Sequence, residues 1–183
     1  MLYNLKISVD NVIAWQPISD KDLICEKFSK EDWHKMVADI NSDRDWQQFL
    51  SDYSLLVKCF VLYRKADDTP IAFAYIMEED DKGKIVSFHG GGWGKSIANT
   101  LLYYRGMIRL VESLLNDGLK VRTACLISNT IAYRFIKSAG FVNYRNSDTY
   151  HYFWINKKRL YSSRIYKSLI LNTCQKFHNL SKD

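Results

Sequence analysis

The stretch from Lys84 to Ser96, KIVSFHGGGWGKS, decides the fold of this chain. It reads as a strand, Lys84 to His89, followed by a glycine-rich turn, Gly90 to Ser96. A long helix should follow, because apolar residues then recur at spacings of three and four: Leu101, Tyr104, Ile108, Val111 and Leu115. A glycine turn that opens a helix presents free N–H groups at the positive end of the helix dipole. This pattern predicts a phosphate-bearing ligand.

Two other interpretations of the glycines were weighed. A plain flexible turn stays open as an alternative. The phosphate-binding loop G-x-x-x-x-G-K-[ST] ends as Gly94-Lys95-Ser96 does, but His89 stands at its first glycine position. The strand expected after the helix also offers no carboxylate for Mg²⁺ within residues 121–125. We therefore reject an ATPase function.

The next segment has its own helix signals. The first helix should end at Gly118, a residue suited to the left-handed position just past a helix end. A strand is predicted from Leu119 to Ile127, and Asn129 is then placed to cap a second helix. That helix should end at Gly140-Phe141 and has four apolar positions: Ile131, Ala132, Phe135 and Ile136.

The segment from Asn129 to Phe141 resembles the asparagine-to-Gly-Phe helix of the GNAT acetyltransferase superfamily. The matching positions are Asn129, Ala132, Phe135 and the closing Gly140-Phe141. The turn and long helix before it are similar to the pyrophosphate-binding element of that family, Q/R-x-x-G-x-G/A.

Two registers of that element are open. In the first, residues 89–94 take the pattern and match both glycines, with His89 in the Gln/Arg position. In the second, residues 93–98 take it, with Trp93 in the first position and Ser96 in place of the first glycine. The second is preferred, because it leaves residues 85–89 free for the preceding strand. Either register places the backbone donors between Gly91 and Ala98.

The resemblance implies a mixed α/β (α+β) fold with a mostly antiparallel central sheet flanked by helices. The GNAT-like domain is expected over residues 1–157, followed by a basic amphipathic extension over residues 158–183. Its order should be one strand, two helices, three antiparallel strands, helix, strand, helix and strand. The segments expected on this pattern are a hairpin of 5–9 and 12–18, helices within 29–40 and 43–53, and strands at 55–65, 71–78 and 150–154.

The resemblance also implies an acetyl-CoA-dependent N-acetyltransferase that acts on the primary amine of a small molecule by direct attack. The alternatives are an acyltransferase using a protein amine or a longer acyl-CoA, and a non-catalytic module that binds CoA. The expected cofactor-binding residues are Val86, Ser87, Phe88, Gly92, Trp93, Gly94, Lys95, Ser96, Ala98 and Asn129. Asn129 could equally be a plain helix cap.

The catalytic residues are harder to carry over, because the tyrosine of the family pattern is Ile136 here. Tyr133 and Tyr144 are substitutes for the acid by proximity. His89 is the first choice for the base, since histidine titrates near neutral pH. The alternative is that His89 has no catalytic role. Glu78 or Glu79, acting through water, is the next candidate for the base.

Composition and charge limit the kinds of protein that this chain can be. The chain has 183 residues, enough for one domain with a hydrophobic core. Residues 157–183 hold seven basic residues and one acidic residue, and the rest has 19 of each, which argues against nucleic acid as a partner. The four cysteines are far apart, so no metal site is expected.

The same features predict the location and partners of the protein. No leader precedes Lys6, and the most apolar segment, residues 55–63, carries Lys58 and is too short to span a bilayer. We therefore expect a cytoplasmic protein with no integral membrane segment. The basic C-terminal helix should show Tyr161, Ile165 and Leu169 on one face. It suits a membrane surface or a partner, or packs back on its own domain, and with the exposed aromatics it permits a homodimer.

Overall fold

The computed structural model describes residues 12–18, 57–79, 84–92 and 96–171. Four predictions lie outside the described residues: the strand at 5–9, the helices within 29–53, the residues Trp93, Gly94 and Lys95, and the tail beyond Leu171.

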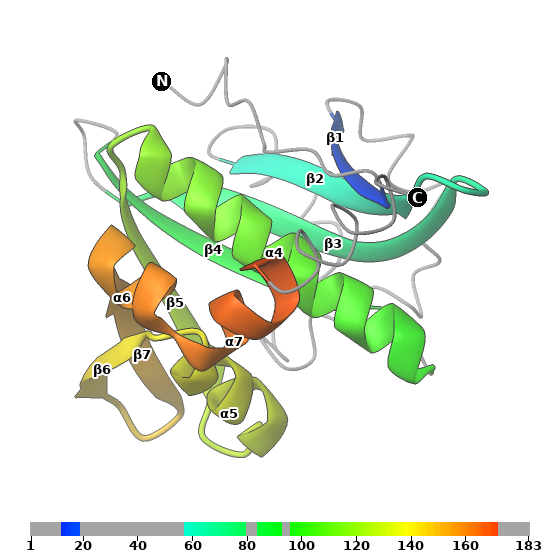
Figure 1. Cartoon of the computed structure of the whole chain (residues 1–183). Coiled ribbons are helices and arrows are strands. Elements are labelled where there is room, and N and C mark those ends of the chain that lie inside the picture. Colours follow the sequence, from blue (N-terminus) through cyan, green and yellow to red (C-terminus); the bar gives the residue numbers. More distant parts are fainter. Residues whose placement is uncertain (1–11, 19–56, 80–83, 93–95, 172–183) are drawn as a thin grey trace.

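The described residues form a seven-stranded sheet of order β1-β2-β3-β4-β5-β7-β6. Neighbouring strands are antiparallel except for β4 and β5, which are parallel (Figure 1). This mostly antiparallel mixed sheet confirms the predicted fold class. The strands are β1 (Ile13–Ile18), β2 (Val57–Arg64), β3 (Thr69–Glu78), β4 (Ile85–Gly92), β5 (Lys120–Leu126), β6 (Val142–Asn146) and β7 (Tyr150–Ile155).

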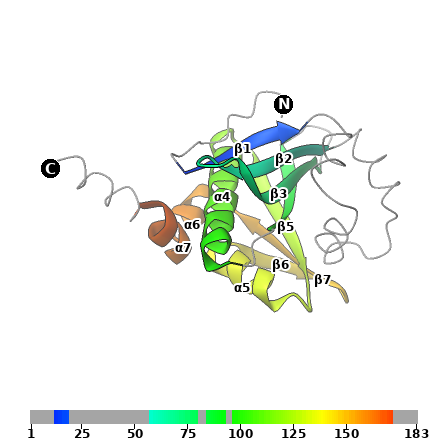
Figure 2. The same ribbon diagram turned by 90° about the vertical axis from the view of Figure 1, so that its right-hand side faces the viewer.

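One long helix, α4 (Ile97–Asn116), crosses the sheet and forms the main core with it. Its middle turns face the strands with side chains that are almost fully buried: Met107, Ile108, Leu110, Val111 and Leu114. Figure 2 shows α4 on one side of the sheet, together with the short C-terminal helices. Those helices are α6 (Lys157–Ser162), α7 (Arg164–Tyr166) and a π-helical turn, η2 (Lys167–Leu171).

The predicted helix ends at Gly118 and Gly140 and the predicted cap at Asn129 are confirmed, whereas the N-cap of α4 was not predicted from the sequence. Ser96 caps α4 by accepting a hydrogen bond from the N–H of Asn99 at 3.1 Å. Asn129 caps α5 (Thr130–Ser138) by accepting from the N–H of Ala132 at 2.9 Å. Gly118 and Gly140 follow the two helices with φ of 80° and 95°, the left-handed region that glycine enters without a Cβ penalty.

The expected glycine turn is partly wrong, because β4 continues to Gly92. Gly90 to Gly92 pair with Ala74 to Ala72 of β3, so the partner strand holds them in the sheet. A Cβ on Gly90 would lie 2.7 Å from the carbonyl oxygen of Phe73 and 2.9 Å from Met107. The strand therefore needs glycine because its neighbours approach closely.

A second difference is β6, which the sequence did not predict. It is an edge strand of five residues, of which Tyr144, Arg145 and Asn146 are exposed, and it pairs with β7 around a bulge between Asn143 and Arg145. A short edge strand buries little, so its hydrophobic pattern is weak.

The C-terminal segment packs against α4 as far as Leu171. Leu160, Tyr166 and Ile170 are buried in the core, and of the predicted apolar face Ile165 and Leu169 are partly buried against it, whereas Tyr161 is exposed. The break between α6 and α7, where Ser163 is extended, shifts the helical register.

A buried polar contact fixes this segment to α4. The hydroxyl of Tyr166 donates to Oε1 of Glu112 at 2.6 Å, and Arg109 donates to Oε2 at 2.7 Å. Burial, followed by the bond to Glu112, raises the pKa of Tyr166, so the hydroxyl stays a donor. Tyr161 makes a looser and more exposed contact with Asn116, at 3.3 Å.

The two tyrosines form a matched pair for a stability measurement. Tyr166→Phe should lower the free energy of unfolding by about 1–3 kcal/mol, because a buried carboxylate oxygen loses its donor. Tyr161→Phe removes an exposed hydroxyl and should cost less than about 1 kcal/mol. Urea unfolding at neutral pH measures both. Equal losses in the two variants would contradict the role assigned to the Tyr166–Glu112 contact.

Candidate active site

The sheet opens between β4 and β5. Their parallel pairing covers only Ile85 to Ser87 against Lys120 to Arg122. Beyond it, residues 88–92 of β4 pair with β3, and residues 123–126 of β5 pair with β7. The two strands therefore form a fork, with one arm at 88–92 and the other at 123–126.

A side chain closes the apex of the fork. The hydroxyl of Thr123 donates to the carbonyl oxygen of Phe88 at 2.8 Å in a buried position. This bond takes the place of the next rung of the backbone ladder. It also shows that the Phe88 carbonyl points toward β5.

The backbone beyond the apex faces the opening. The N–H and C=O groups of one strand residue point to the same side, and alternate residues repeat that direction. Gly90 therefore presents its backbone groups to the fork as Phe88 does. The hydroxyl of Tyr103 on α4 approaches the Gly90 carbonyl at 3.4 Å, from the helix side. The open edge of β4 can hydrogen bond an extended ligand that contains amides.

Both helices begin at the mouth of the fork. Because β4 and β5 are parallel and each is followed by a helix, the N-termini of α4 and α5 lie at the same end of the sheet. The rings of Tyr104 on α4 and Phe135 on α5 stack with centroids 4.3 Å apart, which holds the helices together. The N–H groups of Ile97 and Ala98 have no acceptor within α4, and its first turn carries no acidic residue. This helix end is suited to an anion.

The predicted cofactor-binding residues follow this path. Val86 and Ser87 lie in the paired part of β4, Phe88 at the apex and Gly92 at the strand end. Ser96 and Ala98 lie at the start of α4, and Asn129 at the start of α5. The helix begins at Ile97, as the second register requires. Contact with a cofactor stays a prediction for each of these residues.

His89 lies on the open arm, but the reason for choosing it as a base is wrong. Burial lowers the pKa of its imidazole to about 4, far below neutral pH. The ring stacks on Tyr75 of β3 with centroids 5.0 Å apart. At pH 7 the imidazole is neutral and can accept a proton, although its basicity is weak.

The other predicted catalytic residues lie farther along the fold. Tyr133 on α5 packs against His151 and Phe153 of β7. Tyr144 lies beside Arg122, 5.5 Å from its guanidinium carbon, at the paired end of β5. Glu78 stands opposite Val86, at the closed end of the fork. Their roles stay predictions.

Two residues of this site were missed in the sequence. Thr123 ties the apex, and Tyr103 reaches Gly90 from α4. Thr123 alternates with Val121 and Cys125 in a buried strand pattern, which marks it only as a core position. Burial raises the pKa of Tyr103, so its hydroxyl stays protonated.

Two negative findings concern residues 12–18, 57–79, 84–92 and 96–171. No three His, Cys, Asp or Glu side chains there gather as metal ligands would. None of the helices in those ranges has the length and apolar character needed to cross a membrane.

No protein-family model and no curated protein sequence matches the chain. Solved structures, however, share its fold. The structure of AAC(6')-Ib in complex with ribostamycin and coenzyme A matches with a TM-score of 0.64 at 17% identity, over 84% of this chain and 98% of that chain. Apo FdhC, a nucleotide-linked sugar GNAT, matches with a TM-score of 0.61 at 14% identity, over 88% and 96%.

A third solved structure also shares the fold of this chain. Spermidine N-acetyltransferase from Vibrio cholerae, solved with CoA and spermine, has a TM-score of 0.59 at 10% identity, over 82% of this chain and 99% of that chain. The chain therefore has the GNAT acetyltransferase fold, which confirms the resemblance at the level of the fold.

The pKa of His89 predicts a stability change with pH. Because the pKa falls from 6.5 to about 4 on folding, protonation favours the unfolded chain. The stability that the neutral ring provides is present above pH 6.5 and is lost as the pH falls toward 4. Between pH 7 and pH 4.5, the free energy of unfolding should fall by about 2 kcal/mol more in the wild type than in His89→Gln. Urea titrations at both pH values measure this difference, and equal losses would show that His89 titrates normally.

Proposed function

We propose that this chain is an acetyl-CoA-dependent N-acetyltransferase that acts on the primary amine of a small molecule. The observation that carries the proposal is the fork, where β4 loses its pairing with β5 beyond Ser87 and the backbone of Gly90 faces an opening that leads to the N-terminus of α4. The neighbours support the class of reaction, since structures with this fold contain CoA together with ribostamycin or spermine.

The described residues fit the parts of CoA. The open edge of β4 offers donors and acceptors to the amides of the pantetheine arm. The first turn of α4, which has free N–H groups and no acidic residue, suits the diphosphate. Asn129, which caps α5 through its Oδ1, lies at the start of that helix beside the proposed path of the same arm.

Acetyl-CoA supplies an activated acyl group whose carbonyl carbon is open to attack by an amine. Backbone N–H groups on the open arm of β4 polarise that carbonyl and stabilise the developing oxyanion, which is usually the largest electrostatic contribution. His89 is neutral at pH 7 and accepts the amine proton, directly or through water. Tyr133, one turn into the helix that begins at the fork mouth, donates a proton to the leaving thiolate.

A non-catalytic CoA-binding module is the second candidate. Two observations favour it: burial lowers the basicity of His89, and Ile136, which stands at the tyrosine position of the family pattern, is buried in the core.

Ala98 offers a test of the binding step. It is exposed in the first turn of α4, where Ala98→Glu and Ala98→Gln add side chains of the same size. The carboxylate should weaken CoA binding by roughly tenfold or more relative to the amide, because it competes with the diphosphate for the helix end. Calorimetric titration with CoA measures both. Since an acid in the first turn favours the helix, a loss in Ala98→Glu alone cannot reflect unfolding. Equal affinities would place the diphosphate elsewhere.

A turnover assay distinguishes an N-acetyltransferase from a non-catalytic module that only binds CoA. Incubation with acetyl-CoA and a panel of aminoglycosides, amino sugars and polyamines should release free thiol with at least one acceptor. We expect His89→Gln to lower kcat by about 10²-fold with little change in CoA affinity. Tight CoA binding without thiol release across the panel would favour the module.

A further inference from the structure

A cavity of about 590 Å³ opens at the opposite end of the sheet from the fork mouth. Its walls come from the C-terminal end of α4, the first residues of β5 and the end of β7. The parallel pair is closed at this end, where Ile85 aligns with Lys120. The cavity is therefore separate from the candidate active site, and its size falls within the range of small-molecule sites.

The floor and walls of the cavity are apolar. Leu115, Leu119, Val121 and Ile155 line it from the core side. Trp154 lies opposite Arg122 in the register of β7 and β5 and adds an indole ring. A ligand here would gain from burial of an apolar or aromatic body.

The polar groups that line the cavity are predominantly cationic. Lys120, Arg122 and Lys157 lie around it, and no acidic residue is among the lining side chains that the structure describes. Arg159 adds a guanidinium carbon 5.7 Å from the centre of the Trp154 ring. Outside the lining, Glu79 accepts a hydrogen bond from Arg122 at 2.9 Å and offsets one of these charges. Lys120 and Lys157 are then the remaining cations among the lining residues that the structure describes.

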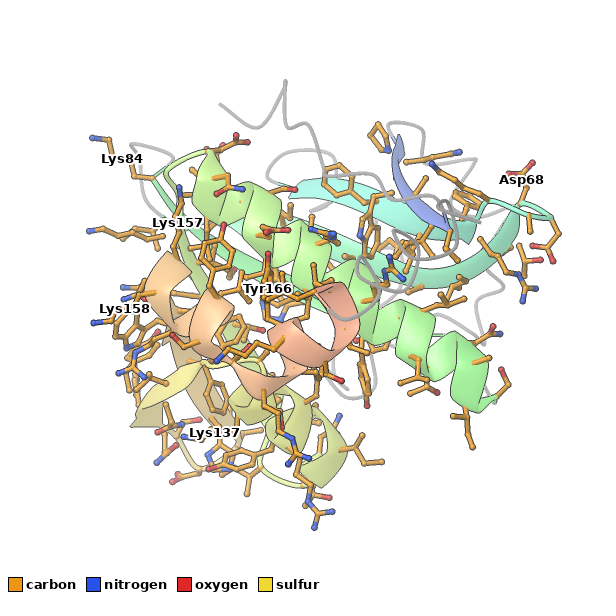
Figure 3. The ribbon with its side chains drawn as sticks, in the orientation of Figure 1. Asp68, Lys84, Lys137, Lys157, Lys158 and Tyr166 are labelled. Carbon is orange, nitrogen blue, oxygen red and sulfur yellow. The ribbon has the colours of Figure 1, made fainter. Side chains whose placement is uncertain are left out.

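The lysines are free to contribute to a ligand. Lys120 and Lys157 are both exposed at the cavity. Figure 3 shows Lys157 next to Lys158 on α6, at the edge of the molecule. Lys158 is exposed as well but does not line the cavity. The same helix thus provides a residue of the site and a matched control.

We propose that this cavity is a second binding site, which takes a small organic anion with an aromatic or apolar body. The apolar walls and Trp154 hold the body, and Lys120, Arg122 and Lys157 hold the anionic group. The amine acceptor of the proposed reaction does not fit here, because its positive charge would meet three cations. The site goes beyond the proposed function and does not depend on it.

The test uses a pair of probes that differ in charge. 8-Anilinonaphthalene-1-sulfonate carries an aromatic body and one sulfonate, and N-phenyl-1-naphthylamine is the same body without the sulfonate. Fluorescence titration of the full chain should show the sulfonate bound at least about tenfold more tightly than the neutral probe. Addition of CoA should leave this binding unchanged, because CoA is assigned to the fork.

Variants then locate the probe. Lys120→Ala/Lys157→Ala should weaken sulfonate binding roughly fivefold to tenfold, and Lys158→Ala should change it by less than about twofold. All three residues are exposed, and thermal unfolding checks that each variant is folded as the wild type is. The proposal is overturned if the wild type does not bind the sulfonate, if CoA displaces it, or if the double variant binds it as the wild type does.

Discussion

The short parallel pairing of β4 with β5 is the constraint on which the rest of the structure depends. If the pairing continued past Ser87 and Arg122, the backbone groups along this edge of β4 would form hydrogen bonds with β5, and no opening would be left between the strands. Instead, the Thr123 hydroxyl takes the carbonyl of Phe88, and the two strands leave each other for β3 and β7. Beyond Phe88, the edge of β4 that faces β5 is therefore no longer paired with a strand.

The helices maintain this opening. The α4 helix packs so closely on β4 that Gly90 has no room for a Cβ, and Gly92 lies against the ring of Tyr103. Its C-terminal half is held from the other side by the C-terminal segment, through Leu160, Ile170 and the Tyr166–Glu112 bond. The stack of Tyr104 on Phe135 joins α4 to α5 near the fork mouth. The N-termini of α4 and α5 are therefore positioned by packing farther along each helix, at residues 106–115 of α4 and at Ile136 of α5.

The two ends of the β4–β5 pair differ in chemistry. At the fork, the proposed binding groups are backbone amides and a helix dipole, and His89 is kept neutral by burial. At the closed end, the proposed binding groups are lysine and arginine side chains around apolar walls. The first end suits a ligand that lies along a strand, and the second suits a compact anion.

The sequence by itself determined the helix cap at Asn129, the helix ends at Gly118 and Gly140, and the strand and helix order of the segment around them. These features depend on neighbours within a few residues, so local patterns record them. It also placed the described candidate cofactor-binding positions in β4 and at the starts of α4 and α5, because those positions follow strand and helix ends.

Only the tertiary structure decided the length of the parallel pairing, the role of Thr123, the pKa of His89 and the strand conformation of the glycine triplet. Each of these arises from residues far apart in the chain, such as Phe88 with Thr123 or Gly90 with Phe73 and Met107. Burial and hydrogen bonding between distant segments leave no spacing in the sequence from which they could be predicted.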